Sequence, residues 1–149
     1  MQNLNLPQYP IKIKEEGGVK YIFDGIRKKY LVLLPEEWVR QNFVQFLIHD
    51  KNYSASLIAI EKGLKVNELQ KRADIVVYSK QAQPIVLVEC KAPSIKINQE
   101  VFEQIARYNL VLKVPYLVVT NGMEHYCAKI DFECNSFEFL EEIPNYKKL

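Results

Sequence analysis

Residues 74–91 read DIVVYSKQAQPIVLVECK, and this stretch decides the fold that the sequence predicts. Two apolar runs flank the polar segment 79–84, a pattern typical of two strands joined by a hairpin loop. Because side chains alternate along a strand, Glu89 and Lys91 are expected to point to the same face. The hairpin would bring Asp74 from the first strand beside that pair.

These three groups have the chemistry of a metal site. Two carboxylates and one amine would converge at the end of an apolar sheet, and Mg²⁺ prefers oxygen ligands with positions left for water and a phosphate. We therefore predict that Asp74 and Glu89 hold Mg²⁺, with Mn²⁺ as a substitute, in a phosphodiesterase site that cuts nucleic acid.

Outward from this hairpin, the pattern predicts helices on both faces of a sheet. Pro35 followed by two acids is typical of a helix start. Residues 1–10 read as a loose arm, 63–70 as a polar connection, and neither 30–34 nor the tail is assigned. In chain order, we predict a hairpin (11–23), a helix (35–50), three strands (57–61, 74–78, 85–91), a helix (98–112), a strand (116–120) and an edge strand (124–130). This order predicts an α/β fold with a mixed central sheet and a core of about 35–130.

The composition is that of one soluble domain. The chain has 149 residues, of which 48% are hydrophobic and 26% charged. Three cysteines form an odd set without tight pairing, which predicts free thiols in a reducing cytoplasm. We expect neither a signal peptide nor a membrane span, because no apolar run approaches the ~18 residues that a span needs.

The charge is unevenly distributed along the chain. Residues 1–72 hold twelve Lys/Arg against eight Asp/Glu, whereas residues 73–149 hold eight against ten. The formal net charge of +2 is too small to indicate nucleic-acid binding by itself. A basic half beside a half with an acidic site nevertheless suits a ligand with a phosphate backbone.

A second motif lies on the second predicted helix. Gln104 and Tyr108 are four residues apart and therefore share one face of that helix. Together with Asp74 and Glu89-Cys90-Lys91, they resemble the PD-(D/E)xK nuclease superfamily, whose restriction-endonuclease-like core runs helix, three strands, helix, strand. Ala73 replaces the proline of the motif. The Gln-x-x-x-Tyr spacing is similar to that of the RecB-like branch.

A narrower resemblance covers residues 27–127, which look like the N-terminal nuclease domain of type I restriction enzyme R subunits. The segments that carry this likeness are 35–40, 71–75, 88–91 and 116–122.

The resemblance implies a role for each candidate residue. Asp74 and Glu89 would hold the metal. Lys91 would stabilise charge and position the attacking water rather than act as a base, because two neighbouring carboxylates raise the pKa of an amine. Gln104 and Tyr108 would orient groups or contact substrate. The remaining candidates are Glu37 for a second metal or its water, and Lys71, Arg72 and Arg107 for the DNA backbone.

The resemblance also bears on partners. R subunits carry an ATP-driven translocase, but this chain has no G-x-x-x-x-G-K-[ST] phosphate loop. We therefore expect a stand-alone domain, or a part that works on DNA with a motor or specificity subunit, or as a homodimer. The alternative is a non-catalytic nucleic-acid-binding or assembly module that keeps the fold.

Each candidate residue also has a purely structural explanation. An acid at a strand start caps a turn, a Glu-x-Lys pair forms an ion pair on one strand face, and an acid in a first helical turn stabilises the helix. These explanations apply to Asp74, to Glu89 with Lys91, and to Glu37. Tyr108 is also suited to core packing, and Lys71 and Arg72 to a solvated surface.

Overall fold

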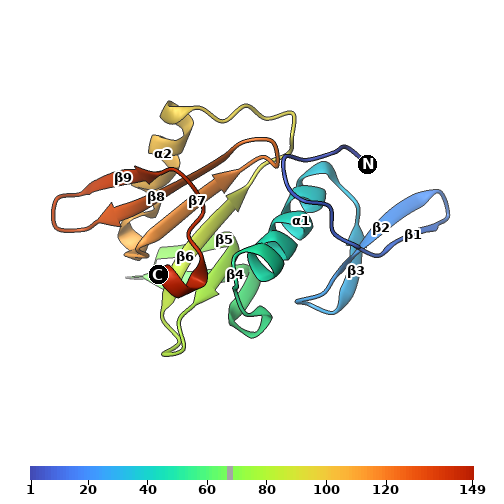
Figure 1. The fold of residues 1–149 in the computed structure, drawn as a ribbon, viewed down its shortest axis with the longest axis horizontal. Coiled ribbons are helices and arrows are strands. Elements are labelled where there is room, and N and C mark those ends of the chain that lie inside the picture. Colours follow the sequence, from blue (N-terminus) through green and yellow to red (C-terminus); the bar gives the residue numbers. More distant parts are fainter. Residues whose placement is uncertain (67–68) are drawn as a thin grey trace.

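The computed structural model describes residues 1–66 and 69–149, and the side chains of residues 65–71 and 108 also lie outside the description. Figure 1 shows the arrangement of the elements. The strands are β1 (Ile13–Glu16), β2 (Val19–Asp24), β3 (Lys29–Val32), β4 (Ile58–Val66), β5 (Leu69–Tyr78), β6 (Pro84–Cys90), β7 (Tyr116–Thr120), β8 (His125–Asp131) and β9 (Ser136–Leu140). The helices are α1 (Pro35–Asp50) and α2 (Gln99–Asn109), with 3₁₀ turns at Ala55–Leu57, Leu110–Leu112 and Tyr146–Lys148.

The central sheet is mixed. Its six strands follow the order β4-β5-β6-β7-β8-β9, and β6 and β7 are its parallel pair. α2 lies between β6 and β7 in the chain, as a parallel pair requires a long crossover connection. The predicted hairpin of residues 74–91 is confirmed, since β5 and β6 pair antiparallel from Ile75↔Val88 to Val77↔Val86.

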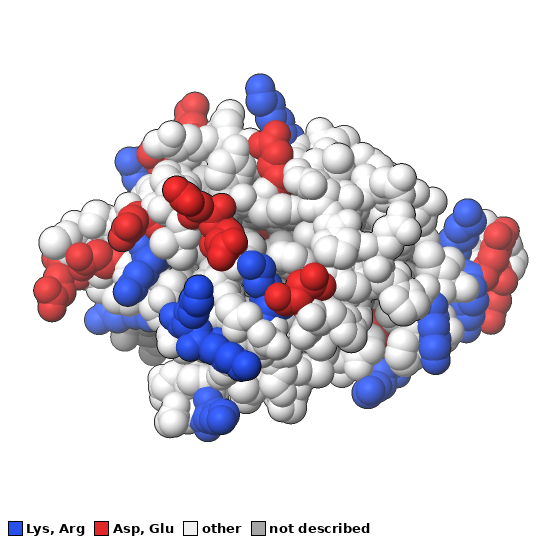
Figure 2. Space-filling view, in the orientation of Figure 1, with Lys and Arg blue, Asp and Glu red and all other residues white. Residues whose placement is uncertain are grey.

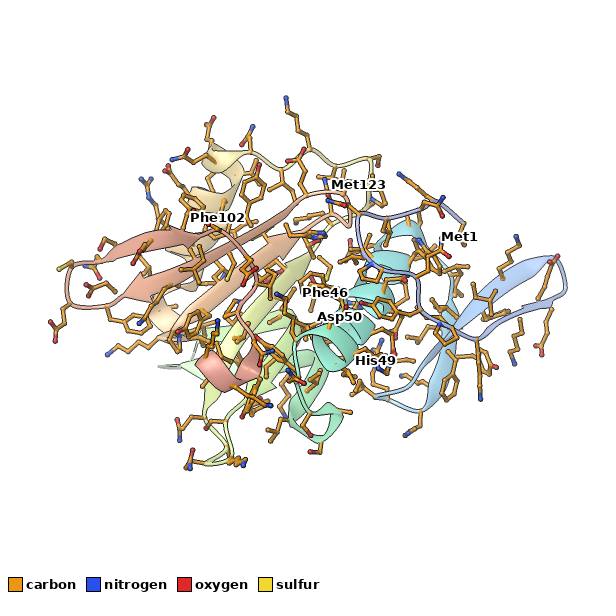
Figure 3. All side chains as sticks on the ribbon, in the orientation of Figure 1. Met1, Phe46, His49, Asp50, Phe102 and Met123 are labelled. Atoms are coloured by element: carbon orange, nitrogen blue, oxygen red, sulfur yellow. The ribbon has the colours of Figure 1, made fainter. Side chains whose placement is uncertain are left out.

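Two helices cover the two faces of this sheet. Ile75 of β5 packs in the core beneath α1, whereas the next residue, Val76, packs in the core beneath α2. Phe46 of α1 and Phe102 of α2 mark the two sides (Figure 3). The predicted α/β fold is thus confirmed, and its central strands are continuously apolar because both of their faces are covered. No helix in the described residues is long and apolar enough to cross a membrane.

The two helices start by different local means. α1 begins with Pro35 and has two acids in its first turn, where they interact favourably with the helix dipole. α2 begins after Asn98, whose side chain accepts a hydrogen bond from the backbone N–H of Val101 at 2.9 Å. The 3₁₀ turn that follows α2 ends at Lys113, which has a left-handed backbone with φ of 54°.

A smaller sheet of β1, β2 and β3 projects beyond α1 (Figure 1). Its inner face carries Ile22 and Asp24, which are fully buried. Asp24 accepts hydrogen bonds from the backbone N–H groups of Ile26 and Arg27, and Arg27 Nε donates to its other oxygen at 2.6 Å. Arg27 Nη1 then reaches Glu61 of β4 at 3.2 Å, so this ion-pair chain joins the small sheet to the central one.

The N-terminal arm has neither helix nor strand, but it is tied to the body more firmly than a loose arm. The backbone N–H of Asn5 donates to the carbonyl of Gly122 at 2.8 Å. Trp38 Nε1 donates to the carbonyl of Gln2 at 2.9 Å, and the hydroxyl of Tyr9 donates to Asp50 at 2.6 Å.

Two predictions about the central sheet were wrong, one about where its strands end and one about which strand lies at its edge. The polar connection expected at 63–70 is strand on both sides, because β4 continues to Val66 and β5 begins at Leu69; residues 67–68 lie outside the description. β8 is not an edge strand, since β9 pairs with it from Cys127↔Leu140 to Asp131↔Ser136. The alternating aromatics of β9 pack on α2, where Phe139 lies 4.9 Å from Phe102 between ring centres.

Candidate functional site

The first candidate pair lies where β5 and β6 end their pairing. Asp74 precedes Ile75, and Glu89 follows Val88, the residue opposite Ile75 in the ladder. The backbone N–H of Cys90 donates to Asp74 Oδ2 at 2.8 Å. This bond fixes the Asp74 carboxylate at the end of the ladder, next to the strand that carries Glu89.

A pocket of about 410 Å³ opens beside this point between the sheet and α2. Its polar lining includes Glu89 and Lys91 from the end of β6, Gln104 from α2, and Arg72 from β5. These four were singled out from the sequence, and the fold brings them to one pocket. Their side chains supply an anion, two cations and an amide, which suits a polar, charged ligand.

Asp74 is not among the described residues that line that pocket, and it is paired with Arg40. The Arg40 side chain is 7% exposed, and its Nη1 donates to Asp74 Oδ1 at 3.0 Å. The same Nη1 lies 3.3 Å from Glu61 Oε1. Burial disfavours the charge of Arg40, but hydrogen bonds to Glu37 and the nearby carboxylates raise its pKa above the ordinary value. The guanidinium is therefore a fixed positive charge behind Asp74.

Glu37 has contacts that differ from the expected metal role. Both of its oxygens accept from Arg40, at 3.0 and 2.6 Å, and Gln41 Nε2 donates to Oε2 at 2.9 Å. Burial raises the pKa of Glu37, but these hydrogen bonds outweigh it and hold the pKa below the ordinary value. The contacts favour a structural role, in which Glu37 orients Arg40.

The neighbouring acid, Glu36, is exposed and is influenced by the charges of the site. Its pKa is raised, first by partial burial and next by the negative charge of Asp74, while the charges of Arg40 and Lys91 act in the opposite direction.

The other residues discussed from the sequence are not among the described residues that line the pocket. Arg107 is exposed near the end of α2 and is not among the described residues that line the pocket. The side chains of Lys71 and Tyr108 lie outside the described part of the chain. Cys90 is 1% exposed, and burial raises the pKa of its thiol well above the ordinary value, so it is not poised as a nucleophile.

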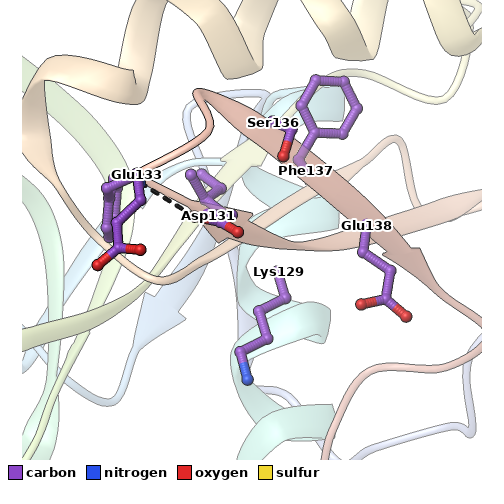
Figure 4. Close-up of a pocket in the computed structure, with 8 residues that line it drawn as sticks. Lys129, Asp131, Glu133, Ser136, Phe137 and Glu138 are labelled. Atoms are coloured by element: carbon purple, nitrogen blue, oxygen red, sulfur yellow. Dashed lines mark hydrogen bonds between the residues drawn. The ribbon is translucent and has the colours of Figure 1, made fainter.

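A larger pocket of about 560 Å³ lies elsewhere, along the β8–β9 hairpin (Figure 4). Its acids serve the turn, since the backbone N–H of Glu133 donates to Asp131 Oδ1 at 3.0 Å. Lys129 and Glu138, which are partners across the two strands, are both exposed. The chemistry-bearing residues therefore gather at the smaller pocket, not the larger one.

A known protein family matches the part of the chain that carries the pocket. The family of the type I restriction enzyme R protein N terminus (HSDR_N) matches residues 35–144. The chain belongs to this family. The matched part of this HSDR_N chain begins with α1 and includes β5, β6 and α2, the elements that carry the pocket.

Among solved structures, the HSDR_N chain is similar to a fragment of a putative HsdR subunit of a type I restriction enzyme from Vibrio vulnificus YJ016. The two share 21% sequence identity with a TM-score of 0.52, and the match covers 75% of this chain and 24% of that one. This likeness supports the fold, and the chain spans about a quarter of the length of that structure. No curated protein matches the chain.

Proposed function

We propose that this chain is a Mg²⁺-dependent DNA endonuclease domain of the PD-(D/E)xK superfamily. The observation that carries the proposal is the single pocket lined by Glu89, Lys91 and Gln104, beside Asp74. Membership of a restriction-enzyme family supports a nuclease-related role. DNA is then the substrate, and a motor, a specificity subunit or a second copy of the chain is the partner. Its three free cysteines fit a reducing cytoplasm.

The residues fit a hard divalent cation by donor type. Glu36 has a raised pKa partly because Asp74 is close, so a cation near both would relieve their repulsion. Across residues 1–66 and 69–149, no three His, Cys, Asp or Glu side chains form a ready-made cage. Mg²⁺ is commonly held by one or two carboxylates with several waters, so Asp74 and Glu89 would suffice, with Glu36 nearby.

The metal would supply charge neutralisation and a more acidic water. Around it, Lys91 would stabilise the negative charge that develops on the phosphate, and Gln104 would orient the nucleophile or substrate by hydrogen bonding. Arg72, exposed at the pocket, would contact the DNA backbone. Arg40 and Glu37 would hold Asp74 in place.

The test measures metal binding and cutting separately. Isothermal titration of Mn²⁺ into the purified protein is expected to reveal a site that Asp74→Ala removes. Plasmid and branched DNA are expected to be nicked by the wild type with Mg²⁺ or Mn²⁺ but not by Lys91→Ala. Glu141→Gln, an exposed acid on the C-terminal segment, is the matched control. If the protein neither binds metal nor cuts DNA, with or without partner subunits, the proposal that it is an enzyme is refuted.

One observation favours a second candidate, a non-catalytic DNA-binding or assembly module. Both oxygens of Asp74 already have partners, Arg40 and the backbone of Cys90. In this case, titration with Mn²⁺ would give no heat of binding, and DNA would be bound without being cut. The pair of experiments therefore separates the two candidates.

A further inference from the structure

The outer face of the small β1–β2–β3 sheet carries three aromatic side chains. The strand register places Phe23 opposite Tyr30, and their rings lie 5.1 Å apart between centres. Tyr21 is two residues before Phe23 and thus shares its face. Because Ile22, on the other face, is fully buried toward the body, the aromatic face looks outward. Tyr30 is 37% exposed on it.

Two lysines lie among these rings. The Nζ of Lys12 is 5.6 Å from the centre of the Phe23 ring. The Nζ of Lys14 is 4.3 Å from the centre of the Tyr30 ring and 5.9 Å from that of Tyr21. The face therefore combines flat aromatic surfaces with ammonium groups only a few ångströms from them.

The charge around this face is mostly positive. Residues 11–32 contain six Lys/Arg and three Asp/Glu, and the acid Asp24 is buried in its bond with Arg27. Lys and Arg side chains gather over the projecting sheet in Figure 2, with acids at its tip. The sheet precedes residues 35–144, the part matched by the HSDR_N family, so that family match does not cover it.

We propose that this face binds single-stranded nucleic acid. Unpaired bases have free ring faces that stack on exposed aromatic side chains, and the phosphates between them are attracted to nearby lysines. A duplex hides its base faces within the stack, so it gains only the phosphate contacts. An acidic protein segment would use the lysines but would leave the aromatic rings without a matched partner.

The lysines hold their present positions weakly. Lys14 also forms an ion pair with Glu16 at 3.1 Å, but both side chains are well exposed, at 40% and 67%. Exposed ion pairs and exposed cation–π contacts are among the weakest polar interactions in proteins. A base is therefore able to take the Tyr30 ring face while Lys14 turns to a phosphate.

This inference extends the proposed function, because a face that holds an unpaired strand would deliver DNA to the Glu89–Lys91 pocket. It is tested without catalysis. Fluorescence anisotropy in EDTA follows a labelled single strand of about 20 nucleotides, longer than the site of one small fold. Titrations are run between about 50 and about 200 mM salt, with a duplex of the same sequence alongside.

Stacking and phosphate contacts are expected to separate by variant. Tyr30→Ala should weaken single-strand binding by about 5- to 150-fold, the effect of losing one stacked base. Tyr30→Phe should keep the affinity. Lys12→Ala and Lys14→Ala should each reduce the slope of log K against log salt by about 0.7, the value for one phosphate of a single strand. Lys80→Ala, an exposed lysine in the loop between β5 and β6, should change neither quantity.

The proposal fails if the single strand does not bind at low salt, or if Tyr30→Ala binds like the wild type. Equal affinity for duplex and single strand also counts against it, because that result requires no stacking. Tighter binding of poly-glutamate than of the oligonucleotide would identify the face as a protein-binding one instead. The nuclease proposal is independent of these results, since Asp74→Asn is expected to bind the single strand like the wild type.

Discussion

Arg40 is the residue at which the charges of the site meet. It is buried and contacts Glu37, Glu61 and Asp74. Arg40→Met would leave the buried Glu37 carboxylate without its main partner, so we expect the free energy of unfolding to fall by about 3–5 kcal/mol. Urea denaturation measures this change.

A double variant tests the reason for that loss. Glu37→Leu in the Arg40→Met background removes both members of the buried pair, and it should recover part of the stability. A single-variant loss below about 1 kcal/mol, the scale of an exposed ion pair, would mean that the Arg40 contacts contribute little.

Glu36 is expected to show a conflict between function and stability. Its pKa is raised, so the folded state binds its proton more tightly than the unfolded state does. The associated stability is therefore present below the unfolded pKa of about 4.3 and is lost as pH rises through the folded pKa. Glu36→Gln should unfold at a slightly higher temperature than the wild type at neutral pH, with no difference in acid. Thermal melts across pH measure this, and Mn²⁺ titration should show weaker binding.

At the scale of elements, the N-terminal arm and the turn after β7 are held together at Gly122. This residue has φ of +86°, and a Cβ there would lie 2.7 Å from Leu4 Cδ2 and 3.1 Å from Val39 Cγ2. Gly122→Ala should thus cost about 1–3 kcal/mol from the left-handed backbone and displace the arm. Denaturation measures the stability, and hydrogen exchange of the Asn5 amide reports on the arm.

A second glycine gives the matched control. Gly25 has no atom within 4 Å of a built Cβ and no positive φ, so Gly25→Ala should leave both readouts almost unchanged. Equal effects of the two substitutions would show that the arm does not depend on the close approach at Gly122.

At the scale of the whole molecule, buried acids join the small sheet to the central one. Burial raises the pKa of Asp24, but hydrogen bonds from Arg27 and Gln41 outweigh it, and the same balance lowers the pKa of Glu37. Groups with lowered pKa values stabilise the fold above about pH 4, and that contribution is lost as pH falls through their folded values.

We therefore expect the unfolding free energy of the wild type to drop steeply below about pH 4. Asp24→Asn should lower stability at neutral pH and flatten this dependence, because one of the two titrating groups is gone. Glu141→Gln, whose carboxylate is exposed, should keep the wild-type curve. Urea denaturation at several pH values provides the measurement, and identical slopes for the three proteins would contradict the role of Asp24.

The sequence was most informative where one local pattern was unambiguous. The apolar runs around Ile75 and Val86 predicted paired strands buried on both faces, and the spacing of Gln104 placed it on a helix that crosses back over them. It was least informative at β4, where polar residues interrupt the alternation, and at β9, a short segment whose extended backbone is stabilised by pairing with β8.

The sequence by itself determined the α/β order of elements and singled out Arg72, Lys91 and Gln104, which line the pocket with Glu89, because periodicity and strand alternation act locally. Only the tertiary structure decided between the adjacent acids of α1. Packing against the sheet turns Glu37 into a buried pair with Arg40 and leaves Glu36 near Asp74. That choice depends on which long-range partners surround each carboxylate, and the local sequence at the start of a helix does not specify those partners.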